Sequence, residues 1–218
     1  MEVERLIERY PRLYHMAEAG TWPSIRQHGL LSSNEVVRLA GLTGNARLSM
    51  RRDHRPEKVP VVVPSIGTVV LRDQKPMEPG RLQQALVDGT TPAEWYELIN
   101  ARVFFWVREE RLLRLLNAQE YEDLEHDVLT LDTASLLAAN VDRVRLCHMN
   151  SGNTKPIPHH RGKDTFKRIE EYPARVRGGP VKEVVEFTVE DRVDNIRPHV
   201  IEVRRMRGTT VLGNLVLD

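Results

Sequence analysis

The order of predicted strands and helices is the feature that most restricts what this chain can fold into. Strand-like and helix-like segments are mixed through the first part of the sequence, whereas strand-like segments cluster near its end. A strictly alternating order would favour a parallel sheet with helices on both faces, but this order favours an α+β arrangement. We therefore predict an α+β fold.

Hydrophobic periodicity and turn residues give the expected positions of the elements. The best-marked helix start is Thr91-Pro92-Ala93-Glu94, which combines an N-cap threonine, a first-turn proline and a glutamate at N3. Further helices are expected at residues 2–9, from 22 to a stop at Gly29, 33–40, 81–87, 108–117 and 133–139. Strands are expected at residues 13–16, 61–63, 68–71, 102–107, 128–131, 143–146, 181–189 and 199–205, with 209–217 left open.

Length and composition are ordinary for a globular protein. The 218 residues suit one domain, expected to span 1–218, and the chain is 40% hydrophobic and 29% charged with a net charge of +1. No apolar run approaches the roughly 20 residues of a membrane span, and the first residues lack the apolar core of a signal peptide. We therefore expect a cytoplasmic protein with no membrane partner.

An irregular and basic loop is expected at about residues 150–180. Four prolines interrupt this segment and no hydrophobic period holds, which is typical of a functional or mobile loop. Between residues 142 and 168, seven lysines and arginines face two aspartates, and such a segment attracts phosphates. We predict nucleic-acid contacts from Lys155, Arg161 and Lys163, with a solvated loop of incidental charge as the alternative.

The sequence offers no strong metal, dinucleotide or P-loop motif. Cys147-His148 and His159-His160 lie close together, but their spacing matches none of the strong zinc patterns. Cys147 is the single cysteine, so there is no disulfide framework, and nothing marks it as an activated nucleophile. Neither GxGxxG nor GxxxxGK[ST] occurs. We predict no metal.

Two polar residues, His15 and Glu183, are set in strand-like sequence near the two ends of the chain. Residues two apart in a strand share a face, so Glu183 is expected in an apolar row with Val181, Val185 and Phe187. A carboxylate in such a row needs a partner or a function, because burying it unpaired is costly. An ion-paired strand residue is the structural alternative, and by the same alternation Glu186 is expected on the opposite face.

Three arginines are candidates for binding an anion. Arg51 and Arg52 precede Lys58-Val59-Pro60, and Arg72 ends the strand-like run at 68–71. An arginine at a strand end can make paired hydrogen bonds to a diphosphate or a carboxylate. A role in surface solubility is the alternative reading for each.

Taken together, four blocks resemble the ADP-ribosyltransferase superfamily, especially the DarT-type DNA ADP-ribosyltransferase toxins, and more faintly the RNA 2'-phosphotransferases. The blocks occur in the expected order across residues 13–197. Arg72-Asp73-Gln74 and the turn at 150–154 have no DarT counterpart. The blocks are Tyr14-His15-Met16 with Trp22-Pro23-Ser24-Ile25 and Gly29-Leu30-Leu31, Arg51-Arg52 with Lys58-Val59-Pro60, Arg102-Val103-Phe104-Phe105-Trp106, and Lys182-Glu183-Val184-Val185 with Val193 and Ile196.

The resemblance implies a split antiparallel sheet with flanking helices that holds NAD, a co-substrate, in a cleft. His15 would bind the ribose next to the nicotinamide, and Trp106 or Phe105 would pack against the nicotinamide ring. Arg52 or Arg51 would bind the diphosphate. Arg72 has no counterpart in the family and is a candidate for the same role only because it ends a strand. Glu183 would be the catalytic carboxylate, because departure of nicotinamide builds an oxocarbenium-like cation that a carboxylate stabilises.

The resemblance also sets the expected reaction and its alternatives. We expect an NAD-dependent ADP-ribosyltransferase that modifies DNA or RNA, as a bacterial toxin or defence effector with an antitoxin or immunity partner. One alternative keeps the fold but uses a protein or an RNA 2'-phosphate as acceptor. Another is a non-catalytic module that binds nucleotide or nucleic acid. NAD consumption by the purified protein separates the enzymatic readings from the last.

Overall fold

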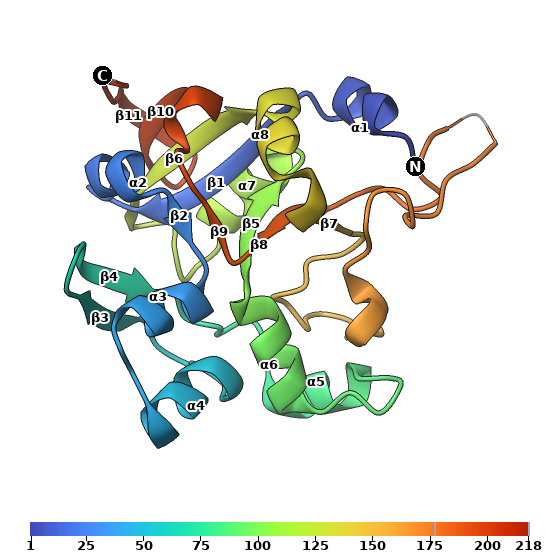
Figure 1. The fold of residues 1–218 in the computed structure, drawn as a ribbon, viewed down its shortest axis with the longest axis horizontal. Helices are drawn as coiled ribbons and strands as arrows, with labels where there is room; N and C mark the ends of the chain where they lie inside the picture. Colours follow the sequence, from blue (N-terminus) through green and yellow to red (C-terminus); the bar gives the residue numbers. More distant parts are fainter. Residues whose placement is uncertain (177, 218) are drawn as a thin grey trace.

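A seven-stranded antiparallel sheet forms the centre of the computed structural model, which describes residues 1–176 and 178–217 (Figure 1). Its strand order is β11-β10-β6-β1-β5-β8-β7, and two further pairs, β2–β9 and β3–β4, lie outside it. The strands are β1 (Arg12–Glu18), β2 (Leu30–Leu31), β3 (Val59–Val63), β4 (Gly67–Leu71), β5 (Arg102–Trp106), β6 (Glu125–Asp132), β7 (Val144–Cys147), β8 (Glu186–Glu190), β9 (Arg192–Val193), β10 (Val200–Arg207) and β11 (Thr210–Asn214).

The helices are short and lie mostly at the positions that the sequence predicts. The side chain of Thr91 accepts from the Glu94 N–H and forms the expected capping box. Ser32 and Asp132 cap two further helices in the same way. The helices are α1 (Val3–Arg9), α2 (Trp22–His28), α3 (Ser33–Leu39), α4 (Gly44–Arg52), α5 (Pro79–Ala85), α6 (Pro92–Asn100), α7 (Glu109–Leu116) and α8 (Thr133–Asn140), with 3₁₀ turns at Val141–Arg143, Lys163–Thr165 and Arg197–His199.

Mixed helices and a large antiparallel sheet confirm the predicted α+β class. The strand expected at 102–107 forms β5, which lies between β1 and β8 in the interior of the sheet. Among the described residues, no helix is both long enough and apolar enough to cross a membrane.

The pairing between β1 and β5 is interrupted, and this interruption positions the site. β1 pairs with β6 along its whole length but meets β5 only at Tyr14 and Trp106. Beyond that pair the carbonyl of Phe104 accepts a hydrogen bond from Nδ1 of His15 at 2.8 Å. The His15 side chain, rather than a backbone N–H of β1, therefore binds this carbonyl of β5, and β1 and β5 separate there.

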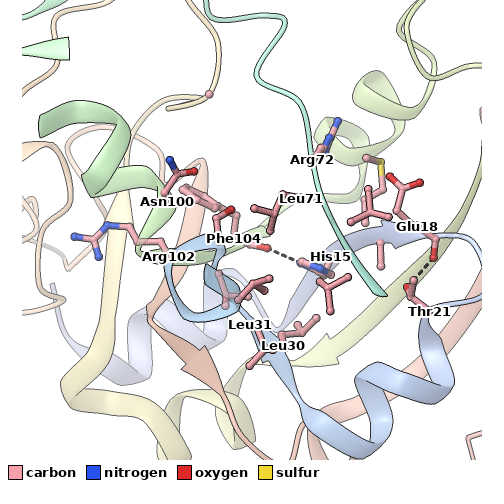
Figure 2. A pocket seen from close by; sticks show the side chains of 18 of the residues that line it. His15, Glu18, Thr21, Leu30, Leu31, Leu71, Arg72, Asn100, Arg102 and Phe104 are labelled. Atoms are coloured by element: carbon pink, nitrogen blue, oxygen red, sulfur yellow. Dashed lines mark hydrogen bonds between the residues drawn. The ribbon is translucent and has the colours of Figure 1, made fainter. Parts of the chain in front are cut away.

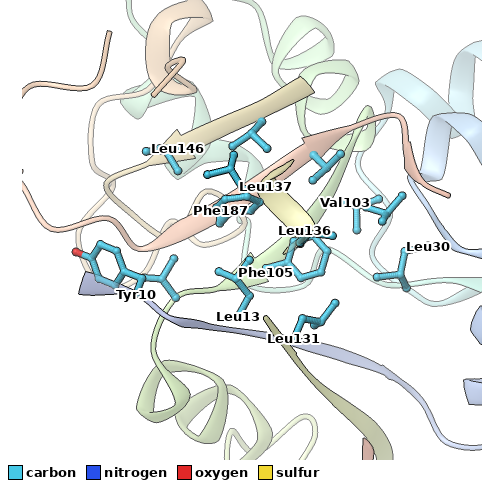
Figure 3. Close-up of a cluster of buried hydrophobic side chains, with 14 of the residues drawn as sticks. Tyr10, Leu13, Leu30, Val103, Phe105, Leu131, Leu136, Leu137, Leu146 and Phe187 are labelled. Carbon is cyan, nitrogen blue, oxygen red and sulfur yellow. The ribbon is translucent and has the colours of Figure 1, made fainter. Parts of the chain in front are cut away.

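The main core lies between the sheet and the helices α1, α2 and α8 (Figure 3). Phe105 of β5 and Phe187 of β8 pack edge to face there, with ring centroids 6.1 Å apart. Because side chains alternate along a strand, Phe105 points into this core while its neighbours Phe104 and Trp106 line a pocket. The prediction that Phe105 contacts a cofactor is therefore wrong: its side chain is only 1% exposed.

The predicted strand at 181–189 is wrong in its first half. β8 begins only at Glu186, where it pairs with Cys147 of β7. Before that point the backbone N–H of Val184 donates to the Tyr10 hydroxyl at 3.2 Å, so it bonds to a side chain rather than to a strand. Alternation counted from residue 181 therefore fails for Glu183, although it correctly places Glu186 on the face opposite Phe187.

Two other segments differ from expectation. The sequence pattern did not predict α4, none of whose residues is buried, so it carries only a weak hydrophobic signal. The segment 150–180 is irregular as predicted, and the described part contains the 3₁₀ turn Lys163–Thr165 and bridges to other elements. Residue 177 lies outside the described residues.

Candidate functional site

A pocket of about 400 Å³ lies where β1 and β5 separate (Figure 2). β1 and β5 form one side of it, and the β3–β4 hairpin with the following Arg72–Gln74 segment forms another. The helix α2, the strand β2 and the turn Asn150–Gly152 add to the lining, as do residues of α3, α6 and α7. Glu186 lines it from β8. The volume is in the range of small-molecule sites.

His15 presents a hydrogen-bond acceptor to this pocket. Its Nδ1 must carry the hydrogen, because its partner, the Phe104 carbonyl, can only accept. Burial lowers the pKa of His15 to about 4, so the ring is neutral at physiological pH. The second ring nitrogen of this tautomer is therefore free to accept from a ligand hydroxyl.

Glu186 is the buried carboxyl group of the pocket. It is 4% exposed, and one carboxyl oxygen accepts from the Ser151 backbone N–H at 3.0 Å. The other oxygen has no hydrogen-bond partner among the described residues. Burial raises the pKa of Glu186 to about 7, against the lowering effect of Ser151. A carboxyl group that titrates near neutrality can donate or accept a proton at the working pH of most enzymes.

Aromatic side chains form a row beside this carboxyl group. Tyr14 on β1, Trp106 on β5 and Glu186 on β8 are register partners in turn, so they lie side by side on one face of the sheet. Both rings line the pocket, as does Phe104. Trp106, which the sequence analysis proposes as a ring-stacking residue, therefore lines the pocket.

Arg72 brings an available positive charge to the pocket. Its guanidinium lies 4.4 Å from the centre of the Tyr121 ring, and the Tyr121 hydroxyl donates to Asp73 at 3.0 Å. Within the described part of the chain, no carboxylate oxygen lies within 4.0 Å of the Arg72 nitrogens. An arginine held by an aromatic ring and lacking an ion-pair partner is suited to bind a ligand anion.

Arg51 and Arg52 do not line the pocket. Both project from α4 onto α6, where Arg51 and Arg52 bind the two carboxylate oxygens of Glu97 at 2.5 and 2.7 Å. Their prediction as ligands of a diphosphate is wrong in placement, because an acidic residue on the neighbouring helix occupies both of them. Of the three predicted arginines, the structure brings only Arg72 to the pocket.

Glu183 also lies outside the pocket. Its carboxylate forms an ion pair with Arg9 and accepts from the Tyr10 hydroxyl at 2.6 Å. The side chain is 50% exposed, and the Arg9 hydrogen bond lowers the pKa of Glu183. The expectation that Glu183 occupies a core-facing row is therefore wrong, and the ion-paired alternative describes it.

The cations of the irregular loop do not form one surface. Lys155 is exposed, and the Lys163 ammonium lies 3.6 Å from Glu94. Arg161 is 1% exposed and donates to three backbone carbonyls, so its prediction as a nucleic-acid contact is wrong. A guanidinium enclosed by protein cannot reach a phosphate.

The described residues contain no cluster of three or more metal-binding side chains. Cys147 is a buried free thiol, and burial raises its pKa well above the ordinary value. A thiol held in its neutral form is a poor nucleophile.

The sequence pattern placed Glu186 on the correct face but did not identify it as a site residue. Glu186, Thr188 and Glu190 alternate with Phe187 and Val189, so the apolar residues face the core and the polar ones face away from it. The expected alternation along residues 181–189 already assigned Glu186 to the non-core face. Whether that face meets solvent or a pocket depends on its neighbours, which the sequence did not reveal.

Comparison with known proteins places the chain only by family. Residues 11–200 match DUF7002, which is described as a family of unknown function. No curated protein and no solved structure matches.

Proposed function

The chain belongs to the DUF7002 family, and we propose that it is an NAD-dependent ADP-ribosyltransferase whose catalytic carboxylate is Glu186 rather than Glu183. The observation that carries this proposal is the meeting of four groups in one pocket: His15, Arg72, Trp106 and Glu186. They come from β1, β5, β8 and the end of the β3–β4 hairpin. The sequence resemblance implies a split antiparallel sheet, and the single-pair junction of β1 and β5 supports it.

The pocket residues suit the chemical parts of NAD. The unprotonated nitrogen of His15 can accept from a ribose hydroxyl, and Arg72 can bind the diphosphate. Trp106 offers an aromatic surface to the nicotinamide ring. The second carboxyl oxygen of Glu186, which has no partner among the described residues, is available to a ribose hydroxyl or to the attacking group.

In the proposed reaction, the bond between the nicotinamide nitrogen and the ribose carbon breaks and its electron pair leaves with nicotinamide. A lone pair of the acceptor then forms the new bond to that carbon. The ionised carboxylate of Glu186 stabilises the cationic transition state and takes the proton of the acceptor. The positive charge of the bound nicotinamide ring would favour this ionised form, which compensates for burial.

The acceptor that we propose is nucleic acid, in a bacterial toxin or defence effector with an inhibitory partner. Fewer loop cations support a nucleic-acid acceptor than the sequence pattern suggested, because Arg161 is buried and Lys163 contacts Glu94. Lys155 remains exposed at the loop surface. A protein or an RNA 2'-phosphate is the alternative acceptor.

Labelled NAD tests the proposal directly. Purified protein is incubated with NAD carrying the label in its adenylate part, together with separate pools of DNA, RNA and protein. We expect release of nicotinamide and transfer of label to one nucleic-acid pool. NAD binding without either product would indicate a non-catalytic binding module, and absence of NAD binding would contradict the proposal.

A further inference from the structure

Arg161 is a buried cation that forms no ion pair with a carboxylate of the described residues. Its guanidinium lies 5.5 Å from the centre of the Trp95 ring and is enclosed by the loop that contains it. No carboxylate oxygen of the described residues lies within 4.0 Å of it. A buried charge in this state needs compensation from nearby dipoles or from a more distant opposite charge.

The hydrogen bonds of Arg161 fix the turn that reaches the pocket. Nη1 donates to the Ser151 carbonyl at 2.9 Å, Nη2 to the Asn153 carbonyl at 2.9 Å, and Nε to the His159 carbonyl at 3.0 Å. Three donors of one side chain therefore hold both ends of the segment between residues 151 and 159. Such a fork is specific to arginine.

Ser151 connects this arginine to Glu186. Its carbonyl accepts from Arg161 while its N–H donates to the Glu186 carboxyl group at 3.0 Å. The same turn is fixed from the other side, where Thr154 N–H donates to the Pro76 carbonyl at 3.1 Å. The Ser151 N–H cannot shift without breaking these bonds, so its direction towards Glu186 is set by the turn.

Besides Arg161, the titratable group that acts on Glu186 is Cys147 of β7. Its thiol donates to the Met149 carbonyl at 3.2 Å, and its raised pKa keeps it neutral. Arg161 is the cation that favours the ionised form of Glu186, and Glu186 in turn favours the charged form of Arg161. The pair is thus coupled through one residue, Ser151, whose N–H and C=O belong to two successive peptide units.

We propose that Arg161 is a positioning residue, which holds the Glu186 carboxylate ionised and correctly oriented through the backbone of Ser151. Its role in turnover rests on the proposed function, but its effect on Glu186 does not. Arg161 touches neither the pocket nor its ligand, so it acts only through the turn and through its charge.

Two substitutions separate these contributions. Arg161→Lys keeps the charge with fewer carbonyl bonds, whereas Arg161→Gln removes the charge and keeps two donors. The titration of Glu186 is followed by the infrared band of its protonated carboxyl group, identified by subtracting the spectrum of Glu186→Gln. We expect Arg161→Gln to raise the midpoint by about 1 pH unit and Arg161→Lys to leave it close to the wild-type value. Arg168→Ala, on an exposed side chain of the same loop, is the control.

Equal midpoints in Arg161→Gln and wild type would overturn the proposal. If neither variant folds, NMR of the wild-type protein provides the test. The chemical shifts of the Ser151 amide and of the Arg161 Nε–H should change with pH at the same midpoint as the Glu186 carboxyl group. An Arg161 resonance that ignores this titration would also overturn the proposal. Neither measurement requires NAD, so a protein without NAD turnover would refute the proposed function while leaving this test intact.

Discussion

Glu183 and Glu186 are three residues apart, yet their surroundings are opposite in almost every physical respect. Glu183 precedes β8, is half exposed, and is paired with Arg9 and Tyr10. Glu186 opens β8, is 4% exposed, and retains one carboxyl oxygen without a partner among the described residues. The pKa of the first is lowered by its hydrogen bonds and that of the second is raised by burial. The comparison shows that a satisfied carboxylate serves structure, whereas a desolvated and incompletely bonded one is available for chemistry.

The largest expected difference between the two carboxylates is in turnover. We expect Glu186→Gln to lower nicotinamide release by about 10²–10⁴-fold, because it removes the group that stabilises the cation and accepts the proton. The matched change Glu183→Gln should alter the rate by less than about 3-fold, because only an exposed ion pair is lost. Initial rates of nicotinamide release measure both. A reversed order of the two variants would restore Glu183 as the catalytic residue.

The two carboxylates should also give the stability of the fold opposite pH dependences. The pKa of Glu186 is about 7 in the folded state against an ordinary 4.5. The folded protein therefore binds this proton more tightly than the unfolded chain does, and the resulting stabilisation is lost as the pH rises from 4.5 through 7. The free energy of unfolding of the wild type should therefore fall by about 3 kcal/mol relative to Glu186→Gln between pH 4.5 and 8. Urea unfolding of both proteins at several pH values measures the difference.

Glu183 provides the contrast for this experiment. Because its folded-state pKa is lowered, its stabilising contribution is present above the ordinary value of 4.5 and is lost as pH falls below it. Since the side chain is half exposed, we expect that contribution to be at most about 1 kcal/mol. Parallel pH profiles for the two Gln variants would contradict the assignment of their surroundings.

A smaller effect, on NAD affinity, is expected when Arg72 or Arg52 is replaced, because these two arginines also differ in whether a carboxylate binds them. Arg72 packs on the Tyr121 ring and has no acidic partner in the described part of the chain, whereas Arg52 is bound by Glu97. We expect Arg72→Gln to weaken NAD binding about 10-fold, in line with about 1.5–3 kcal/mol for a hydrogen bond to a charged group. Arg52→Gln should change the affinity by less than about 2-fold. Calorimetric titration with NAD distinguishes the two, and similar losses would place the diphosphate elsewhere.

The smallest expected effect concerns Tyr10, whose hydroxyl bonds both Glu183 and the Val184 N–H. Tyr10→Phe leaves the buried N–H of Val184 without its acceptor, which should lower the free energy of unfolding by about 1–2 kcal/mol. Turnover should fall by less than about 3-fold, because β8 begins after this contact. A loss as large as that of Glu186→Gln would mean that the segment before β8 takes part in the site.

Local chemistry explains what could be predicted from the sequence. The Thr91 capping box, the strands β3, β4 and β5 and the α+β class each follow from residues close together in the chain. His15, Arg72 and Trp106 were also identified, and all three line the pocket. These predictions succeed because helix caps, turns and alternation depend on neighbours within a few residues.

Only the tertiary structure could decide which charged residues have partners. Glu97 on α6 binds Arg51 and Arg52. The Tyr10 hydroxyl binds the backbone of Val184, so no strand forms there and β8 begins only at Glu186. Backbone carbonyls enclose Arg161. Each of these partners except those of Arg161 lies tens of residues or more away in the sequence. By itself the sequence determined which residue types are present and where most of the strands and helices form, although it missed α4 and the true start of β8. The fold decided their burial and pairing, and these set the desolvation, the pKa and hence the chemical availability of each group.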